Sequence, residues 1–157
     1  MHTRQANMAD TAEISAFLQK LTALGKRTMP SDEDYVRTHY ITHPDNILCT
    51  VAVDEDGSLL GLQILKIASQ DNVYGVTQGW GIIGTHVAPN AARRGVGKTL
   101  FAATLVAAIN AGLQKIDATI GAANDQALGY YEAMGFQTYK TPNNRVCKCY
   151  ILNPNRS

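Results

Sequence analysis

The chain has 157 residues, of which 45% are hydrophobic and 17% charged, and its formal net charge is +1. This length suits one domain, and a chain of this size can bury enough surface to form a core without disulfides or metals. A net charge near zero argues against a protein that binds nucleic acid or a membrane through a strongly basic surface. We therefore expect a single domain, residues 1–157, with neither nucleic acid nor a membrane as a partner.

The cysteines and the apolar stretches indicate the cellular compartment in which the protein works. Cys49, Cys147 and Cys149 are odd in number and too few for a disulfide framework, and reduced thiols are typical of the cytoplasm. The first residues are polar and lack the apolar segment of a secretory signal. The longest apolar stretch, residues 100–113, is interrupted by Asn110 and is too short for a membrane span. These features predict a cytoplasmic protein.

Hydrophobic periodicity and turn signals predict an alternation of helices and strands. The first half is expected to hold helices over 10–24 and 31–44, and strands over 49–53, 59–67 and about 79–87. In the second half we expect helices over 98–111 and 124–134, and strands over 116–120, 136–139 and 146–152. With one more strand at the start, the order is strand, two helices, three strands, helix, strand, helix, two strands. This order predicts an α/β (α+β) protein with a mixed sheet covered by helices on both faces.

A basic, glycine-rich turn, Arg93-Arg94-Gly95-Val96-Gly97, leads from an extended segment directly into the helix at 98–111. Free N–H groups at a helix start favour an anion, and glycines let the backbone approach it closely. Arg93, Arg94 and Lys98 add three positive charges with no acidic residue between them. By itself, the pattern fits either a phosphate or pyrophosphate site or a tight turn with solvated basic residues.

Gly97-Lys98-Thr99 also matches the end of a Walker A loop. The first glycine of that motif would stand at position 92, which is Ala92, and the preceding strand is polar and ends at Pro89. Asp117 lies inside its expected strand, not at the end where a Mg²⁺ ligand would be needed. A P-loop nucleotide-binding protein is therefore only a remote alternative.

Two blocks of the sequence together resemble the signatures of the GNAT (GCN5-related) N-acetyltransferases. Val87-Ala88-Pro89, a spacer and the glycine turn resemble the acetyl-CoA signature of that family. The segment from Asn124 through Tyr131 to Gly135-Phe136 resembles the second signature, N-x-x-A-x-x-x-Y-x-x-x-G-F. The resemblance extends over nearly the whole chain and implies a mostly antiparallel sheet of about six or seven strands flanked by about four helices.

The resemblance implies acetyl-CoA as the acyl donor. The glycine turn would hold the pyrophosphate, the strand at 85–87 would pair with the pantetheine arm, and Asn124 would contact that arm or simply cap its helix. Ala92 departs from the family's Gln or Arg, which puts a side-chain contact there in doubt. The implied donor-binding residues are Thr85, His86, Val87, Arg93, Arg94, Gly95, Val96, Gly97, Lys98, Thr99, Asn124 and Tyr131.

For catalysis, the resemblance points to Tyr131 as the general acid that assists the departing CoA thiolate. A thiol has a pKa near ~8.5 and a phenol near ~10, so a tyrosine can donate a proton or a hydrogen bond to that sulfur. The alternative is that Tyr131 only packs on an apolar helix face; its neighbour Tyr130 points elsewhere and is the weaker candidate. The positions where family members carry a base, Gly81 and Ile83, cannot titrate. His86 or a chain of water molecules is left for that role.

The implied function is an N-acetyltransferase that moves an acetyl group from acetyl-CoA to a primary amine by direct attack in a ternary complex. The acceptor can be a small molecule, an amino acid or a peptide or protein N-terminus, in a cleft that involves residues 25–35 and the loop after Ile67. A non-catalytic acyl-CoA sensor or regulatory module is the alternative. Members of the family are often dimers, so a homodimer is left open. No metal is expected, because neither His39 with His43 nor Cys147 with Cys149 has a third ligand in view.

Overall fold

The computed structural model describes residues 1–27, 29–91 and 94–152, in which seven strands form one sheet in the order β1-β2-β3-β4-β5-β7-β6. All neighbouring strands are antiparallel except β4 and β5, which are parallel. This confirms the expected mixed, mostly antiparallel sheet. The strands are β1 His2–Gln5, β2 Asn46–Val53, β3 Leu59–Ile67, β4 Gly81–Val87, β5 Lys115–Gly121, β6 Gln137–Lys140 and β7 Arg145–Ile151.

Four α-helices accompany the sheet: α1 Thr11–Ala23, α2 Glu33–Val36, α3 Val96–Asn110 and α4 Asp125–Met134. Three of them lie where helical periodicity predicted a helix, with ends that differ by one or two residues. Left-handed glycines follow or precede them where the sequence predicted a turn, with φ of +79° at Gly95 and +106° at Gly135.

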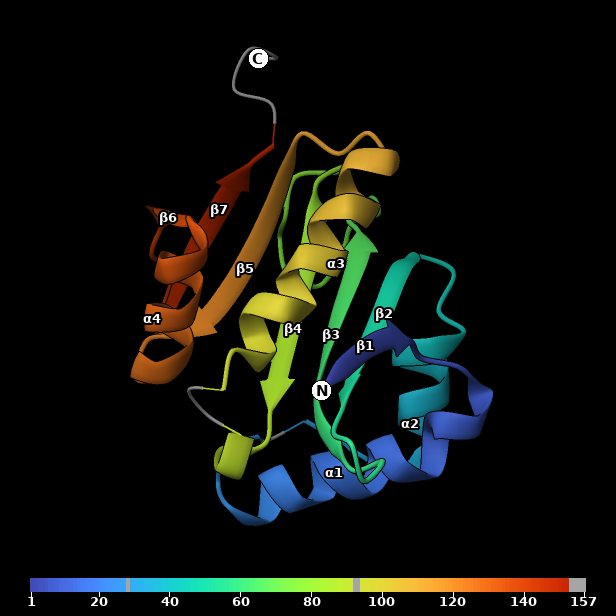
Figure 1. The fold of residues 1–157 in the computed structure, drawn as a ribbon. Helices are drawn as coiled ribbons and strands as arrows, with labels where there is room; N and C mark the ends of the chain where they lie inside the picture. The colour runs from blue at the N-terminus through green and yellow to red at the C-terminus, as the bar shows by residue number, and fades with distance from the viewer. Residues whose placement is uncertain (28, 92–93, 153–157) are drawn as a thin grey trace.

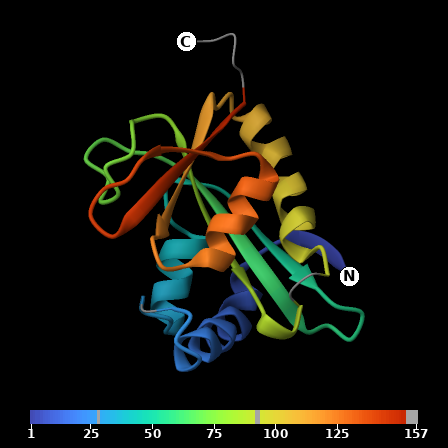
Figure 2. The same cartoon turned by 90° about the vertical axis from the view of Figure 1, so that its left-hand side faces the viewer.

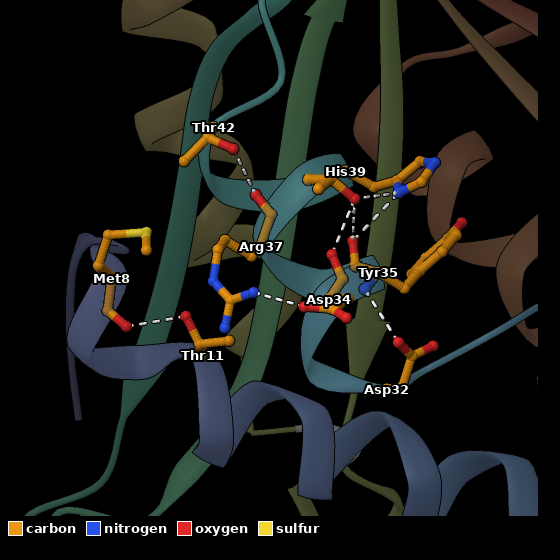
Figure 3. Close-up of polar contacts among 9 residues, drawn as sticks. Met8, Thr11, Asp32, Asp34, Tyr35, Arg37, His39 and Thr42 are labelled. Carbon is orange, nitrogen blue, oxygen red and sulfur yellow. Dashed lines mark hydrogen bonds and ion pairs between the residues drawn. The ribbon is translucent and has the colours of Figure 1, made fainter.

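The helix expected over 31–44 is shorter and irregular. It begins after Asp32, whose carboxylate accepts a hydrogen bond from the Tyr35 backbone N–H at 3.3 Å (Figure 3). After α2 the chain forms a π-helical turn, Arg37–Ile41, in which the Thr42 N–H donates to the Arg37 carbonyl at 2.8 Å. Hydrophobic spacing does not separate a π-turn from an α-helix, so the sequence predicted one continuous helix.

The two faces of the sheet carry separate packing. On one face α1, α2 and the π-helical turn pack on β2 and β3, with Ile14, Leu18 and Leu62 fully buried. On the other face α3 and α4 pack on the sheet through buried residues such as Leu100 and Phe101. Figure 1 shows α3 in front of the strands and α1 crossing below them, and Figure 2 shows α4 beside α3 from the side. Within the described ranges, no helix is both long and apolar enough to traverse a bilayer.

The sheet is interrupted between β4 and β5, and this interruption creates the space for a binding site. β4 and β5 pair only through Gly81 with Ile116 and Ile82 with Asp117. β4 then continues to Val87 and β5 to Gly121 without pairing with each other, and Figure 1 shows the two strands moving apart toward their C-terminal ends. The edge of β4 that faces β5 therefore offers unpaired backbone N–H and C=O groups.

Candidate active site

A cavity of about 1000 Å³ lies where β4 and β5 separate. Its wall comes from the end of β4, the start of α3, the loop after β5, one side of α4 and the end of α1. Among the residues that the sequence singled out, those lining the cavity are Thr85, His86, Val87, Gly95, Val96, Gly97, Lys98, Asn124 and Tyr131. Segments far apart in the sequence thus meet at one concave surface, as ligand sites commonly require.

The glycine turn supplies the start of α3 to this wall. Gly95 adopts a left-handed conformation, and the Thr99 N–H and hydroxyl both donate to its carbonyl, at 3.0 and 2.8 Å. The N–H groups of the first helical turn, at Val96, Gly97 and Lys98, have no partner within the helix. They and the positive end of the helix dipole therefore favour an anion at this end of the cavity.

Gly97 is constrained by the opposite wall. A Cβ at this position would lie 2.5 Å from Cε1 of Tyr130, closer than atoms tolerate. The Tyr130 hydroxyl donates to the Gly97 carbonyl at 2.7 Å. The absence of a side chain thus lets α4 close against α3 while both helices still border the cavity.

Three of the residues predicted to bind acetyl-CoA are not among those that the structure places at the cavity. The Arg94 guanidinium pairs with Asp54 in the β2–β3 turn at 3.4 Å, and Arg94 does not line the cavity. Thr99 does not line it either, because its hydroxyl bonds back to Gly95. Arg93, like Ala92, lies outside the described residues. The exposed Lys98 is therefore the charged side chain of the turn that the structure places at the cavity.

Asn124 occupies the position that was expected to serve two roles. It is the N-cap of α4, and its side-chain oxygen accepts a hydrogen bond from the Ala127 N–H at 3.1 Å. Because a cap of this kind uses the oxygen, it leaves the amide NH₂ of this cavity-lining residue free to bind a ligand.

Tyr131 lies at the inner end of the cavity, with its side chain 5% exposed. Its hydroxyl and the Thr85 hydroxyl form a hydrogen bond of 2.8 Å, which joins α4 to β4 across the open part of the sheet. Burial raises the pKa of Tyr131 well above its usual range. The residue therefore remains protonated at every physiological pH and can act as a hydrogen-bond donor.

No motif in the sequence indicated Gln63, a fully buried residue of β3 that organises this region. Its amide nitrogen donates to the hydroxyls of Thr85 and Tyr130, each at 3.0 Å, and its amide oxygen accepts from Thr104 on α3. A buried polar network whose members are all bonded holds each side chain in one orientation. Gln63 thus fixes the two hydroxyls that border the cavity.

His86 points to the face opposite Thr85, as its alternate position on the strand predicted. Its Nε2 lies 3.3 Å from Nη1 of Arg27, and its ring meets that of Tyr40 edge to face. Because arginine only donates, this Nε2 is the unprotonated acceptor. Burial, and then the neighbouring Arg27 charge, lower the pKa of His86 to about 4. The Nε2 lone pair, which a base would use to take a proton, already accepts a hydrogen bond from Arg27.

Neither Gly81 nor Ile83, the positions where relatives would carry a base, has a titratable side chain. A Cβ at Gly81 would come within 2.9 Å of Leu113 and 3.0 Å of Leu65, and Ile83 is buried in the core. The acidic residues at 32–34 are exposed and do not line the cavity; Asp34 pairs with Arg37 at 2.6 Å (Figure 3). From the expected acceptor segment, Gly25 and Lys26 do line it. The cavity residues of the described chain include no carboxylate.

A metal centre is not indicated by the described part of the chain, in which no three His, Cys, Asp or Glu side chains gather. His39 stacks on Tyr35 at a centroid distance of 3.9 Å, and Cys147 and Cys149 are buried thiols in β7.

Comparisons with known proteins agree with this geometry. The model of the acetyltransferase (GNAT) family matches residues 16–136, whereas a search of curated proteins found no match. Among solved structures, a GCN5-related N-acetyltransferase from Kribbella flavida is similar at 20% identity and a TM-score of 0.75, covering 96% of each chain. A GNAT acetyltransferase from Staphylococcus aureus is similar at 12% identity and a TM-score of 0.77, covering 97% of this chain and 99% of that one. A phosphinothricin acetyltransferase from Sinorhizobium meliloti, solved with AcCoA, has 20% identity and a TM-score of 0.74 over 95% and 86% of the two chains.

Proposed function

Because this chain belongs to the acetyltransferase (GNAT) family, we propose that it transfers the acetyl group of acetyl-CoA to a primary amine, with both substrates bound together. One observation carries the proposal: the glycine turn, the open edge of β4 and the Tyr131 hydroxyl border the same cavity. Each fits one part of the donor, namely pyrophosphate, amide-bearing arm and thioester.

The residues at the cavity fit acetyl-CoA in chemistry and in space. The N–H groups at the start of α3, with Lys98, would hold the pyrophosphate. The unpaired edge of β4 at Thr85, His86 and Val87 would pair with the amides of the arm as it would with a peptide strand, and the Asn124 NH₂ would donate to a carbonyl there. Bound acetyl-CoA supplies a thioester, which is an acetyl group activated toward amines. Orientation of the two substrates would supply much of the rate enhancement.

Tyr131 is the catalytic residue of this proposal. The Thr85 hydroxyl accepts a hydrogen bond from the Gln63 amide and can donate a hydrogen bond to the Tyr131 oxygen, which leaves the phenolic hydrogen free to point at the leaving sulfur. Because burial raises the pKa of Tyr131 far above the ~8.5 of a thiol, full proton transfer is uphill. Tyr131 therefore stabilises the developing negative charge by a hydrogen bond in a site sheltered from water.

The acceptor must lose a proton before or during attack, and solvent removes it in this proposal. No carboxylate is found among the described cavity residues, and His86 Nε2 is engaged by Arg27. An amine with a pKa near ~10 is mostly charged at neutral pH, so the rate should rise with pH until the amine itself is neutral. The Tyr131 position and the open cavity favour turnover over the alternative, a sensor that only binds acyl-CoA.

The testing experiment measures binding and turnover separately. Calorimetry with acetyl-CoA, and with ATP plus Mg²⁺ for comparison, reports the donor site. Release of free thiol from acetyl-CoA in the presence of a panel of primary amines reports transfer, with Tyr131→Phe as the control. Acetyl-CoA binding and amine-dependent thiol release that falls in Tyr131→Phe would support the proposal. Tight binding without release for any amine would favour the sensor, and ATP binding without acetyl-CoA binding would refute both.

A further inference from the structure

Arg27 is a buried cation that pairs with no carboxylate among the residues that the structure describes. Its side chain lies in the segment after α1 and is 8% exposed. Its Nη1 contacts the Tyr40 hydroxyl at 3.1 Å and His86 Nε2 at 3.3 Å, and its Nη2 donates to the Pro30 carbonyl at 2.7 Å. Its Nε is buried and has no partner, and none of the ion pairs among the described residues includes Arg27.

Such an arrangement is costly in an isolated protein. A buried charge is normally paired, and a buried donor without an acceptor loses the hydrogen bond that it made with water. The aromatic rings of Tyr35 and Tyr40, with centroids 5.7 and 5.9 Å from the guanidinium carbon, offset part of this cost. They provide no acceptor for Nε. The group is therefore suited to an oxyanion that arrives from outside the chain.

Arg27 does not itself line the cavity, but it lies directly against a residue that does. His86, its partner, lines the cavity and follows directly on Thr85, which bonds the Tyr131 hydroxyl. Lys26, the residue before Arg27 in the chain, also lines the cavity and is exposed. With no carboxylate among the described lining residues, this side of the cavity is positively charged. An acceptor that carries only an amino group would offer no negative charge to pair with these cations.

We propose that Arg27 binds a carboxylate on the acceptor, so that the acceptor is a small primary amine that also carries a carboxylate, as amino acids do. The inference rests on the proposed acetyl transfer and adds its substrate class. A protein N-terminus has no carboxylate at this distance from its amine unless a side chain supplies it, so small amino carboxylates are favoured over protein acceptors. The planar guanidinium suits this role because it can present two parallel donors to a carboxylate.

The test compares each of a set of L-amino acids with its own carboxamide and with the amine that lacks the carboxyl group. For the best amino acid we expect kcat/KM about 10- to 100-fold above that of its carboxamide, the range typical of a buried charge-assisted hydrogen bond. In Arg27→Gln this preference should fall to about threefold or less, and Arg27→Lys should keep an intermediate value. The matched control is Arg37→Gln, which removes the charge of a half-buried arginine that pairs with Asp34 and should keep the full preference (Figure 3).

Calorimetric binding of the same amino acids and carboxamides, in the absence of acetyl-CoA, gives a readout that does not need turnover. Tighter binding of the amino acids that is lost in folded Arg27→Gln would support the inference. Equal binding and turnover of acids and carboxamides by the wild-type protein would overturn it without any variant, and so would a preference that persists in Arg27→Gln. If carboxylate-free amines are acetylated as well as amino acids, only the inference fails. If acetyl-CoA does not bind and no amine is acetylated, the proposed function itself fails.

Discussion

The two sides of the cavity are built in different ways. The donor side consists of continuous segments, the β4 end with the glycine turn and the start of α3, and α4 from Asn124 to Tyr131. It presents mainly backbone groups. The side proposed for the acceptor comes from three parts of the chain: β4 supplies His86, which lines the cavity, and the segment after α1 and α2 with its π-helical turn supply Arg27, Tyr35 and Tyr40, which do not. It presents side chains. A site for a constant ligand can be encoded locally, whereas a site that sets specificity is assembled from distant residues, each free to vary.

Gly97→Glu should disrupt the donor side most. Its side chain would collide with Tyr130 and bring a negative charge to the anion-binding helix start. We expect acetyl-CoA affinity to fall by at least ~100-fold, measured by calorimetry, since a good phosphate contact and shape are both lost. Gly129→Glu adds the same charge on α4, where a Cβ meets nothing within 4 Å, and should bind normally. Equal losses in the two variants would contradict a site at the glycine turn.

Tyr131→Phe and Tyr130→Phe should separate chemistry from binding within the donor side. Removing the Tyr131 hydroxyl should lower kcat about 100-fold with little change in the KM for acetyl-CoA, because the bond is needed in the transition state. Tyr130→Phe loses its bonds to Gly97 and Gln63 and should mainly weaken acetyl-CoA binding, by about fivefold. Steady-state kinetics with varied acetyl-CoA distinguish the two. A kcat that is unchanged in Tyr131→Phe would assign this residue to packing alone.

The contact between His86 and Arg27 should make the unfolding free energy depend on pH. His86 has a pKa lowered to about 4, against about 6.5 in the unfolded chain. The unfolded chain therefore binds the proton more readily than the folded protein does. The stability contributed by neutral His86 is complete above about pH 6.5 and is lost as the pH falls toward 4. We expect about 2–3 kcal/mol less unfolding free energy at pH 4 than at pH 7 from this group.

Urea unfolding at several pH values, compared between wild type and His86→Gln, measures that contribution. The glutamine oxygen can still accept from Arg27 but does not titrate in this range. Between pH 7 and pH 4 the wild type should lose about 2–3 kcal/mol more of its unfolding free energy than His86→Gln does. His39→Gln removes an exposed histidine and should follow the wild type. Parallel curves for wild type and His86→Gln would mean that His86 is not buried against Arg27.

The smallest expected effects distinguish the roles of two basic residues of the glycine turn, Lys98 and Arg94, in acetyl-CoA binding. Lys98 lines the cavity, whereas Arg94 pairs with Asp54 away from it. Lys98→Gln should weaken acetyl-CoA binding about fivefold at low salt, and less at high salt, because an exposed cation near a phosphate is screened. Arg94→Gln should change the affinity by less than about twofold, as expected for an exposed ion pair. A larger effect of Arg94→Gln would bring that residue back to the donor site, where the sequence placed it.

Local sequence carried much of the fold and of the donor side. Leu59–Ile67 was predicted with its observed ends, and the N-cap Asn124 and the glycine turn were found where their residue types indicated. These features depend on neighbours in the chain, through capping bonds and the positive φ that glycine allows. The π-helical turn was not predicted, because its hydrogen bonds shift by one residue without changing the apolar pattern.

The sequence by itself determined the element order, the anion-binding turn and the place of Tyr131 on its helix, because each depends on residues a few positions apart. Only the tertiary structure decided that Gln63 holds the hydroxyls of Thr85 and Tyr130, that Arg94 turns away to Asp54, and that Arg27 meets His86. Those contacts join residues from 22 to 67 positions apart in the chain. Their energies come from burial and pairing in space, which periodicity and local motifs do not encode.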